Sequence, residues 1–254
     1  MAADQYLQTI LNREAVDTGP YSAVRGVQSV IQPPIAQWAG NQLLGVSPSG
    51  SFMKGTANRS GTDIDLFISL SPNVRETLKE IYESLFTRLS QIGYNPKQQN
   101  VSINVKVSGY SVDLVPAKHQ GGYGTDHSLY RRRGGEWQKT NVTTHIAHVR
   151  QYGRLSESRI LKVWRSQKGL DFPSFYLELT VIDALSWQVL HETLSGNVWK
   201  VFEYLRDSFV NARVVDPANT NNIISDDLLA AEKAKIKAAA TAALGAKTWE
   251  EIVR

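Results

Sequence analysis

Residues 50–66 read GSFMKGTANRSGTDIDL and contain the strongest functional signal in the chain. Within them, Asp63 and Asp65 stand two positions apart at the start of a run of Ile, Leu and Phe residues that predicts a β-strand over residues 63–70. Alternate side chains of a strand leave the same face, about 6.6 Å apart at Cα, so both carboxylates can reach one pair of metal ions. Taken alone, the pair is also compatible with a solvated acidic strand end.

The segment before this strand is rich in small residues. Gly50 and Gly55 give it a flexible backbone, while Ser51 and Thr56 add two hydroxyl groups. Backbone amides in such a turn can cradle a triphosphate whose magnesium ion is held by the carboxylates that follow. The loop and the two aspartates therefore support one another as a nucleotide site.

A third carboxylate lies further along the chain. Residues 101–107 and 110–114 alternate between apolar and other side chains around a Ser-Gly turn, which predicts a β-hairpin. Asp113 lies on its second strand, which we expect beside the strand of Asp63 and Asp65. A lone aspartate would more often be an edge residue, but three carboxylates can meet on one face of such a sheet.

The remaining elements are mostly helices. Within residues 71–92, the apolar residues recur at helical spacing and form one stripe, which predicts a helix packed on the sheet. Residues 20–45 have helical spacing interrupted at Pro33 and Pro34, which predicts a kinked or broken helix. Glycine-rich residues 121–135 predict a mobile connection.

The order of these elements predicts an α+β fold with two lobes. Helix, strand, helix and hairpin come first, and the chain is mostly helical after about Thr140. We therefore expect a mixed-sheet lobe over residues 1–139 that holds the carboxylates, followed by an α-helical lobe over residues 140–254.

Composition narrows the class of protein. The 254 residues are 42% hydrophobic, carry a formal net charge of +4 and include no cysteine, which excludes disulfides and thiol catalysis. No stretch has about 18 consecutive apolar residues, and the first residues do not resemble a secretory signal. We expect a soluble, cytoplasmic protein that does not act at a membrane. Its basic charge suits polyanions and equally suits an ordinary solvated surface.

The motifs resemble a known superfamily. GS at 50–51, GT at 55–56, DID at 63–65 and a later strand aspartate are similar to the polymerase β-like nucleotidyltransferases. The resemblance is to their template-independent branch, which includes oligoadenylate synthetases, cyclic GMP-AMP synthases, bacterial CD-NTases and archaeal-type CCA-adding enzymes. It extends over most of the chain, because second-lobe landmarks of the oligoadenylate synthetase and CD-NTase group are also matched. These are KTNVTTHIAHV at 139–149, RILKVW at 159–164, PSFYLEL at 173–179 and VVDPANTNNI at 214–223.

The resemblance implies a bilobal transferase with its active site in the cleft between the lobes. Residues 1–139 would be the nucleotidyltransferase catalytic lobe, and residues 140–254 a lobe like the C-terminal part of oligoadenylate synthetases. Asp63 and Asp65 would ligate two Mg²⁺ ions, for which Mn²⁺ can substitute. Asp113 would ligate the ion that lowers the pKa of the attacking hydroxyl.

It also implies a set of nucleotide contacts. Gly50 and Ser51 would bind the donor triphosphate, and Lys162 and Ser174 match positions that contact it. Phe175 matches an aromatic residue, usually Tyr, that stacks on the donor base; Phe keeps the stacking surface and loses the hydroxyl. Considered without the family, Lys162 is a cation on an amphipathic helix, and Phe175 is a core residue.

The implied function is synthesis of a cyclic or linear oligonucleotide second messenger from nucleoside triphosphates, in bacterial antiphage signalling. One alternative is nucleotide addition to an RNA 3′ end, as CCA-adding enzymes perform, and another is a non-catalytic nucleotide- or RNA-binding module. Expected partners are nucleoside triphosphates, RNA as acceptor or activator, and a regulatory protein. The joined bases, the linkage, ring closure, the activating signal and the oligomeric state stay open.

Overall fold

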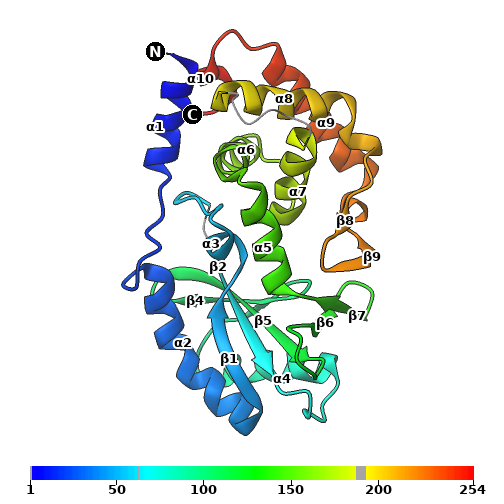
Figure 1. Ribbon diagram of the computed structural model, residues 1–254. Coiled ribbons are helices and arrows are strands. Elements are labelled where there is room, and N and C mark those ends of the chain that lie inside the picture. The colour runs from blue at the N-terminus through cyan, green and yellow to red at the C-terminus, as the bar shows by residue number, and fades with distance from the viewer. Residues whose placement is uncertain (1, 62, 187–192) are drawn as a thin grey trace. The chain divides into compact units, whose positions relative to one another are not determined.

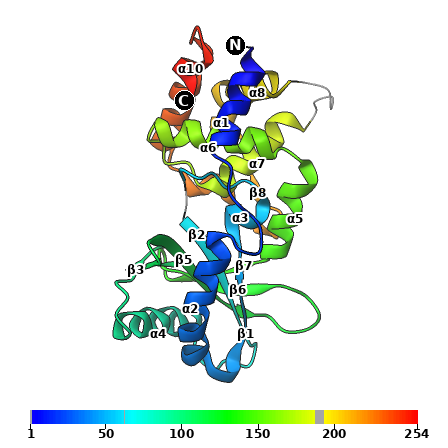
Figure 2. The ribbon, with the colours of Figure 1, turned by 90° about the vertical axis from the view of Figure 1, so that its left-hand side faces the viewer.

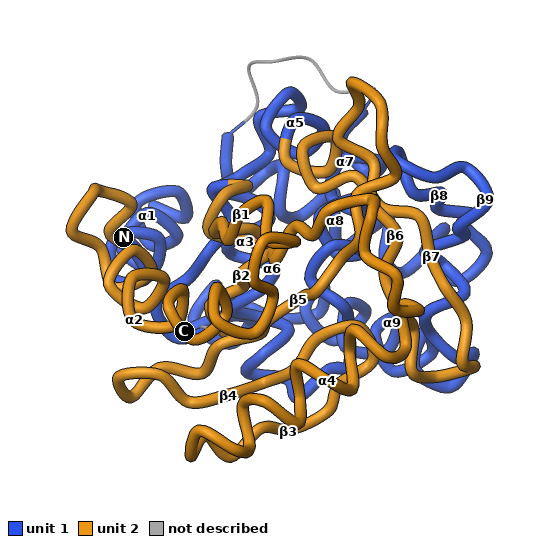
Figure 3. Tube along the Cα trace, turned by 90° about the horizontal axis from the view of Figure 1, so that it is seen from below, with its two compact units in different colours: residues 1–16, 55–61, 147–254 blue, residues 17–54, 62–146 orange. Residues whose placement is uncertain are grey.

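The computed structural model describes residues 2–61, 63–186 and 193–254 and divides into two compact units (Figures 1 and 3). Unit 1 comprises residues 1–16, 55–61 and 147–254, and unit 2 comprises residues 17–54 and 62–146. Unit 2 is built around a mixed β-sheet, whereas unit 1 is mainly helical. The predicted α+β, bilobal fold is therefore confirmed.

Unit 2 contains one seven-stranded sheet and the helices that pack on it. The strands are β1 (Leu43–Pro48), β2 (Asp63–Leu70), β3 (Lys97–Gln98), β4 (Ile103–Val107), β5 (Tyr110–His119), β6 (His127–Arg131) and β7 (Glu136–Thr140). The helices are α2 (Ala23–Ala39), α3 (Gly50–Lys54) and α4 (Leu78–Gln91), and α5 (Val142–Tyr152) starts in this unit. Figure 1 shows α2 and α4 alongside the sheet.

The sheet places β2 and β5 next to each other at its centre. Its order is β1-β2-β5-β4-β3; β6 also pairs with β5, and β7 pairs with β6. β2 and β5 run parallel, and the predicted hairpin of β4 and β5 is confirmed as an antiparallel pair. Ser108 and Gly109, which join β4 to β5, both have positive φ, at 50° and 86°, as a tight hairpin turn requires.

The helix that contains Pro33 and Pro34 is continuous, so of the two predicted alternatives, a kinked or a broken helix, the broken one is wrong. α2 continues from Ala23 to Ala39 through both prolines. Ile31 and Ile35, on either side of them, are fully buried, so the apolar stripe is unbroken. Packing of that stripe outweighs the backbone hydrogen bonds that proline cannot donate.

The next helix begins later than the sequence predicts. α4 starts at Leu78, because Thr77 and Glu80 form a capping box in which each side chain accepts from the other residue's backbone N–H. Ser71, the predicted start, instead accepts a hydrogen bond from the N–H of Asn73 and lies in a turn.

Two predicted loops contain regular structure. Residues 50–54 of the small-residue segment form the short helix α3. Strand β6 lies within residues 121–135, where we predicted a mobile connection, and is held by hydrogen bonding on both edges to β5 and β7. In β6, the alternate residues His127 and Leu129 are buried and pack in the interior. The many glycines around this strand are why the sequence predicted a loop.

Unit 1 is a helical assembly around one hydrophobic core. Its elements are α1 (Ala3–Arg13), the end of α5, α6 (Leu155–Gln167), α7 (Ser174–Leu185), α8 (Leu194–Asp207), α9 (Ala230–Leu244), α10 (Trp249–Ile252) and a two-stranded ribbon of β8 (Val215–Asp216) and β9 (Asn219–Ile223). Figure 2 shows α1 near α6, α8 and α10, and α1 contacts all three.

The grouping of α1 with the C-terminal helices follows from burial. Leu7, Ile10 and Leu11 are buried in the same core as Trp164 and Phe202. The compact unit 1 thus contains both ends of the chain. The predicted functional lobes, residues 1–139 and 140–254, are instead each continuous in sequence. Those ranges, and a cleft between them, stay predictions. None of the helices described is long and apolar enough to cross a membrane.

Candidate active site

Asp65 and Asp113 are register partners on the adjacent parallel strands β2 and β5. Partners in register project from the same face, and Asp63, two residues before Asp65, projects from that face as well. The electrostatic influence of Asp63 and Asp113 reaches Asp65. The strand register therefore places the three predicted carboxylates on one face of the β2–β5 pair.

Gly50 and Ser51 also meet Asp65. The backbone N–H of Ser51 donates a hydrogen bond to the Asp65 carboxylate. Gly50 has φ +54°, and a Cβ atom there would lie 1.7 Å from Oδ2 of Asp65. Only glycine allows this approach of the α3 backbone to the carboxylate, which explains the residue at this position.

Burial and crowding perturb two of the carboxylates. Burial, together with repulsion from Asp113, raises the pKa of Asp65 to about 6, although the cation of Lys54 acts in the opposite direction. Burial also raises the pKa of Asp113, with a smaller contribution from Asp63 and against a hydrogen bond from Asn104. Carboxylates with these shifts are costly to ionise without a nearby cation.

Asn104 fixes the orientation of Asp113. It lies opposite Asp113 on β4, and its Nδ2 donates to Asp113 Oδ1 at 2.7 Å and to Ser111 Oγ at 2.8 Å. A side chain held in this way is oriented before any ligand arrives. Sequence patterning did not single out Asn104, because its role depends on strand pairing.

The donor set suits a hard divalent cation. Carboxylate oxygens are preferred ligands of Mg²⁺, and such an ion would offset the burial and the repulsion from Asp113 that raise the pKa of Asp65. Across the described residues, no three or more His, Cys, Asp or Glu side chains already form a group that could hold a metal ion. The ligand roles of Asp63, Asp65 and Asp113 stay predictions.

Lys162 lies in a buried polar cluster of unit 1. Its Nζ donates to Oε1 of Glu178 at 2.5 Å and to Oγ1 of Thr56 at 2.9 Å. The Thr56 hydroxyl in turn donates to the same Glu178 oxygen. Lys162, Thr56 and Glu178 are 6%, 0% and 0% exposed. The hydroxyl of Thr56, predicted to line a phosphate loop, is thus turned into the interior.

Ser174 and Phe175 begin helix α7, also in unit 1. Nη1 of Arg165 donates to the Ser174 hydroxyl at 3.0 Å and to the carbonyl of Phe172 at 2.7 Å. The Ser174 oxygen therefore acts as an acceptor there and keeps its own proton for another partner. Phe175 is partly buried and packs against the core, so its side chain is shared between core and surface.

Sequence reasoning missed Glu178 and Arg165. Glu178 is the single charge within the apolar run FYLELTVI at 175–182, where a charged residue needs a buried partner. That signal was visible in the sequence. The identity of the partner was not, because Lys162 lies on a different helix.

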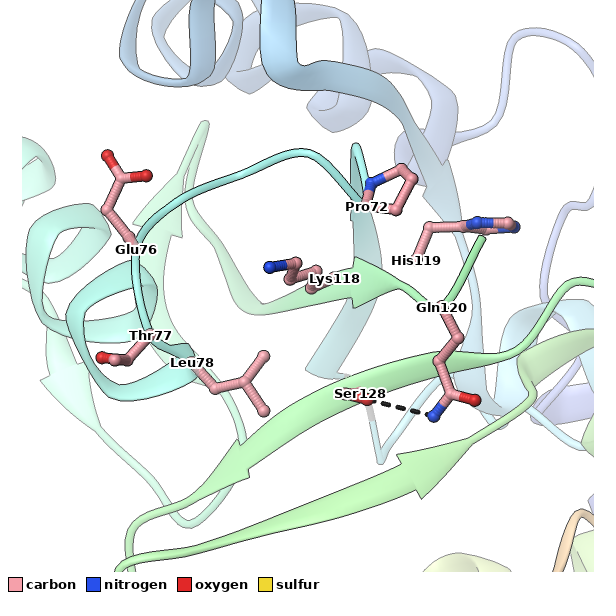
Figure 4. Close-up of a pocket in the computed structure, with 8 residues that line it drawn as sticks. All are labelled: Pro72, Glu76, Thr77, Leu78, Lys118, His119, Gln120 and Ser128. Atoms are coloured by element: carbon pink, nitrogen blue, oxygen red, sulfur yellow. Dashed lines mark hydrogen bonds between the residues drawn. The ribbon is translucent and has the colours of Figure 1, made fainter. Parts of the chain in front are cut away.

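A pocket of about 520 Å³ lies elsewhere in unit 2 (Figure 4). Lys118, His119 and Thr77 are among its lining residues. Lys118 is five residues beyond Asp113 along β5, or about 17 Å away for an extended strand, so this pocket is separate from the carboxylates. It contains none of the predicted site residues.

Comparison with known proteins finds a curated protein of similar sequence and solved structures of similar fold. No family model matches the sequence. The chain is 26% identical over 202 residues to a cyclic AMP-AMP-AMP synthase of Escherichia coli strain MS 115-1. That alignment covers 70% of this chain, which spans 63% of the relative's length.

Solved structures share the fold. E. coli MS115-1 CdnC with ATP matches with a TM-score of 0.76 at 21% identity, covering 96% of this chain and 91% of that one. The same protein in a complex with HORMA-deltaN matches with a TM-score of 0.73 at 20% identity, over 96% and 90% of the two chains. The Cid1 poly(U) polymerase bound to MgATP matches with a TM-score of 0.65 at 11% identity, over 97% and 95%. These comparisons confirm the resemblance to polymerase β-like nucleotidyltransferases of the CD-NTase group.

Proposed function

We propose that this chain, whose sequence and fold resemble those of CD-NTases, is a template-independent nucleotidyltransferase. It makes a cyclic or linear oligonucleotide second messenger from nucleoside triphosphates. The observation that carries the proposal is the pairing of Asp65 with Asp113 in register, with the Gly50 and Ser51 backbone against the Asp65 carboxylate. The name of the E. coli relative, a cyclic AMP-AMP-AMP synthase, supports it.

Asp63, Asp65 and Asp113 would hold two divalent ions, Mg²⁺ or in its place Mn²⁺. Such ions, when bound, activate an acceptor hydroxyl and neutralise the leaving pyrophosphate. No side-chain nucleophile is required.

The protein's own groups prepare this site. Asn104 donates a hydrogen bond to Asp113, and the Ser51 backbone N–H donates one to Asp65. Both carboxylates are therefore oriented before a ligand binds. Because Gly50 has no side chain, the turn that carries Ser51 can lie directly against the acidic cluster. A triphosphate bound by Ser51 would therefore bring its charge beside the aspartates.

The remaining nucleotide contacts are proposed in unit 1. The Ser174 hydroxyl accepts from Arg165 and can donate its proton to a phosphate oxygen. Phe175 offers an aromatic face for the donor base. Lys162 would contribute positive charge, and its Nζ donates to Glu178 and Thr56.

We further propose that the product acts in bacterial antiphage signalling inside the cytoplasm, under the control of a regulatory protein. The structure of E. coli CdnC in a complex with HORMA-deltaN supports the last point by similarity. A second candidate is nucleotide addition to an RNA 3′ end, since the poly(U) polymerase Cid1 shares the fold. A non-catalytic nucleotide- or RNA-binding module is the third, and the crowded carboxylates disfavour it because a binding module gains nothing from their repulsion.

The acceptor distinguishes these functions. Purified protein is incubated with Mg²⁺ or Mn²⁺ and radiolabelled nucleoside triphosphates, with and without deproteinised tRNA. A messenger synthase consumes triphosphates without any polynucleotide and yields a short product, which resists phosphatase if it is cyclic. Label that migrates only with tRNA would support the RNA-extending enzyme, and tight nucleotide binding without transfer would support the binding module.

A further inference from the structure

Glu178 belongs to no predicted site, yet it is the centre of the buried cluster in unit 1. One of its oxygens, Oε1, accepts from both the Lys162 ammonium and the Thr56 hydroxyl. All three side chains are removed from solvent. Bonds of this kind, made in a medium of low dielectric, fix the geometry of the groups that make them.

The donors of Lys162 are directed within this cluster. An ammonium group has three protons. Lys162 has one short bond to Glu178, one to the hydroxyl of Thr56 and a longer one, 3.3 Å, to the carbonyl oxygen of Thr56. Lys162 therefore holds the backbone of Thr56 as well as its side chain.

Thr56 is part of a short segment, residues 55–61, which is anchored to unit 1 along its length. The amide of Asn58, 5% exposed, donates to the carbonyl of Arg159 at 2.8 Å and accepts from Nε of Arg159 at 3.1 Å. The N–H of Ser60 donates to the carboxylate of Glu14 at 2.8 Å. The segment is thus held by side chains from α6, α7 and the end of α1.

This segment has a particular place in the chain. Gly55 directly follows Lys54, the last residue of α3, which carries Gly50 and Ser51. Its other end, Gly61, lies two residues before Asp63, the first residue of β2. Residues 55–61 therefore connect the proposed donor loop to the proposed metal ligands.

We propose that Glu178 is a positioning residue for the donor nucleotide. It acts through Lys162 and Thr56, which hold residues 55–61. The chain continues from the ends of this segment to Ser51, four residues before Gly55, and to Asp63, two residues after Gly61. The inference rests on the proposed function, because it assigns a purpose to the cluster only if these residues bind a nucleotide. Two apolar side chains in place of Lys162 and Glu178 would give the folded protein comparable stability. Stability alone therefore does not explain why these two charged residues are buried together.

Two variants of Thr56 form a matched pair and leave the charged side chains of Lys162 and Glu178 unchanged. Thr56→Val keeps the shape and removes the hydroxyl, whereas Thr56→Ser keeps the hydroxyl. We expect Thr56→Val to raise the KM for the triphosphate, and the Kd for a non-hydrolysable ATP analogue, roughly tenfold. Amide hydrogen exchange in residues 57–60 should accelerate in parallel. Thr56→Ser should restore both properties to near the wild-type values.

Measuring KM distinguishes a variant that positions the nucleotide poorly from one that is partly unfolded. A variant that is partly unfolded has fewer active molecules, which lowers the apparent kcat and leaves KM unchanged. Thr56→Val with a wild-type KM and Kd would overturn the proposal, as would equal impairment of Thr56→Ser. If Thr56→Val does not fold, Glu178→Gln carries the same test, since it keeps an acceptor oxygen and removes the charge.

The nucleotide titration also separates this inference from the proposed function. Wild-type protein that binds no ATP analogue contradicts the proposed function itself. Wild-type protein that binds the analogue, with variants that bind it equally well, contradicts only the role of Glu178.

Discussion

Asp65 on β2 and Asp113 on β5 are direct register partners across two parallel strands, and each is partly buried. Two carboxylates in this relationship repel one another and lose hydration. The arrangement is unfavourable in the absence of a cation and favourable for a protein that binds one.

Replacing Asp65 with Asn should abolish nucleotide transfer and stabilise the metal-free fold. The pKa of Asp65 rises from 3.8 to about 6, so its ionisation costs the folded state up to about 3 kcal/mol above pH 6. Because the folded pKa is raised, the wild type is destabilised as the pH rises from 4 to 6. In EDTA, Asp65→Asn should therefore unfold at a higher temperature than the wild type at pH 7.5, with a smaller difference at pH 4.5. Near wild-type turnover in Asp63→Asn, Asp65→Asn or Asp113→Asn would refute the ligand assignment.

Metal affinity should fall as the medium becomes acidic. A ligand carboxyl must be deprotonated, so binding of Mn²⁺ should weaken by about tenfold for each pH unit below 6 and level off above it. Electron paramagnetic resonance of free Mn²⁺ between pH 5 and pH 8 measures this directly. A flat profile over that range would mean that Asp65 does not compete with protons for the ion.

Gly50→Ala should disable the site while Gly26→Ala does not. A Cβ on Gly50 would overlap Oδ2 of Asp65, and its φ of +54° is unfavourable for other residues, so the turn must move away from the carboxylate. We expect loss of transfer and weaker binding of Mn²⁺. Gly26, inside α2, has open space around its Cβ position, and its replacement should stabilise the protein by about 0.5–1 kcal/mol. Equal activities of the two variants would contradict the assigned contact.

Lys162→Ala and Ser174→Ala should differ in stability. Loss of Lys162 removes the cation that donates to the buried Glu178 carboxylate, which should lower the free energy of unfolding by about 3–5 kcal/mol. Ser174 is partly exposed at the start of α7, so its loss should cost little stability and mainly raise the KM for the triphosphate. Urea denaturation and steady-state kinetics of both variants provide the comparison. Equal stabilities would mean that the Lys162–Glu178 pair is not maintained in solution.

Phe175→Ala should chiefly weaken recognition of the donor base. Stacking is worth about 1–3 kcal/mol per base, so nucleotide affinity should fall by roughly tenfold or more. Phe175→Tyr keeps the aromatic face and serves as the control, with affinity close to the wild type. Unchanged affinity together with lower stability in Phe175→Ala would assign this partly buried side chain to the core alone.

Local patterns in the chain were sufficient to predict the strand of Asp63 and Asp65, the hairpin that carries Asp113, and the α+β class. Each of these depends on alternation or spacing within a few residues, which constrains the backbone directly. Helix limits were predicted less well: the start of α4 depends on the competition between Ser71 and the stronger capping box of Thr77 and Glu80.

Relationships between distant residues became visible only in the folded chain. The register of β2 against β5 makes Asp65 and Asp113 partners, and a turn 15 residues before Asp65 explains why position 50 is glycine. Lys162 could be recognised in the sequence as a cation, but its burial with Glu178 and Thr56 depends on the packing of α6 against α7 and on the course of residues 55–61. A local pattern fixes which face a side chain leaves, while its partner and its pKa depend on which other segment covers that face, because burial and Coulomb interactions act through space and not along the chain.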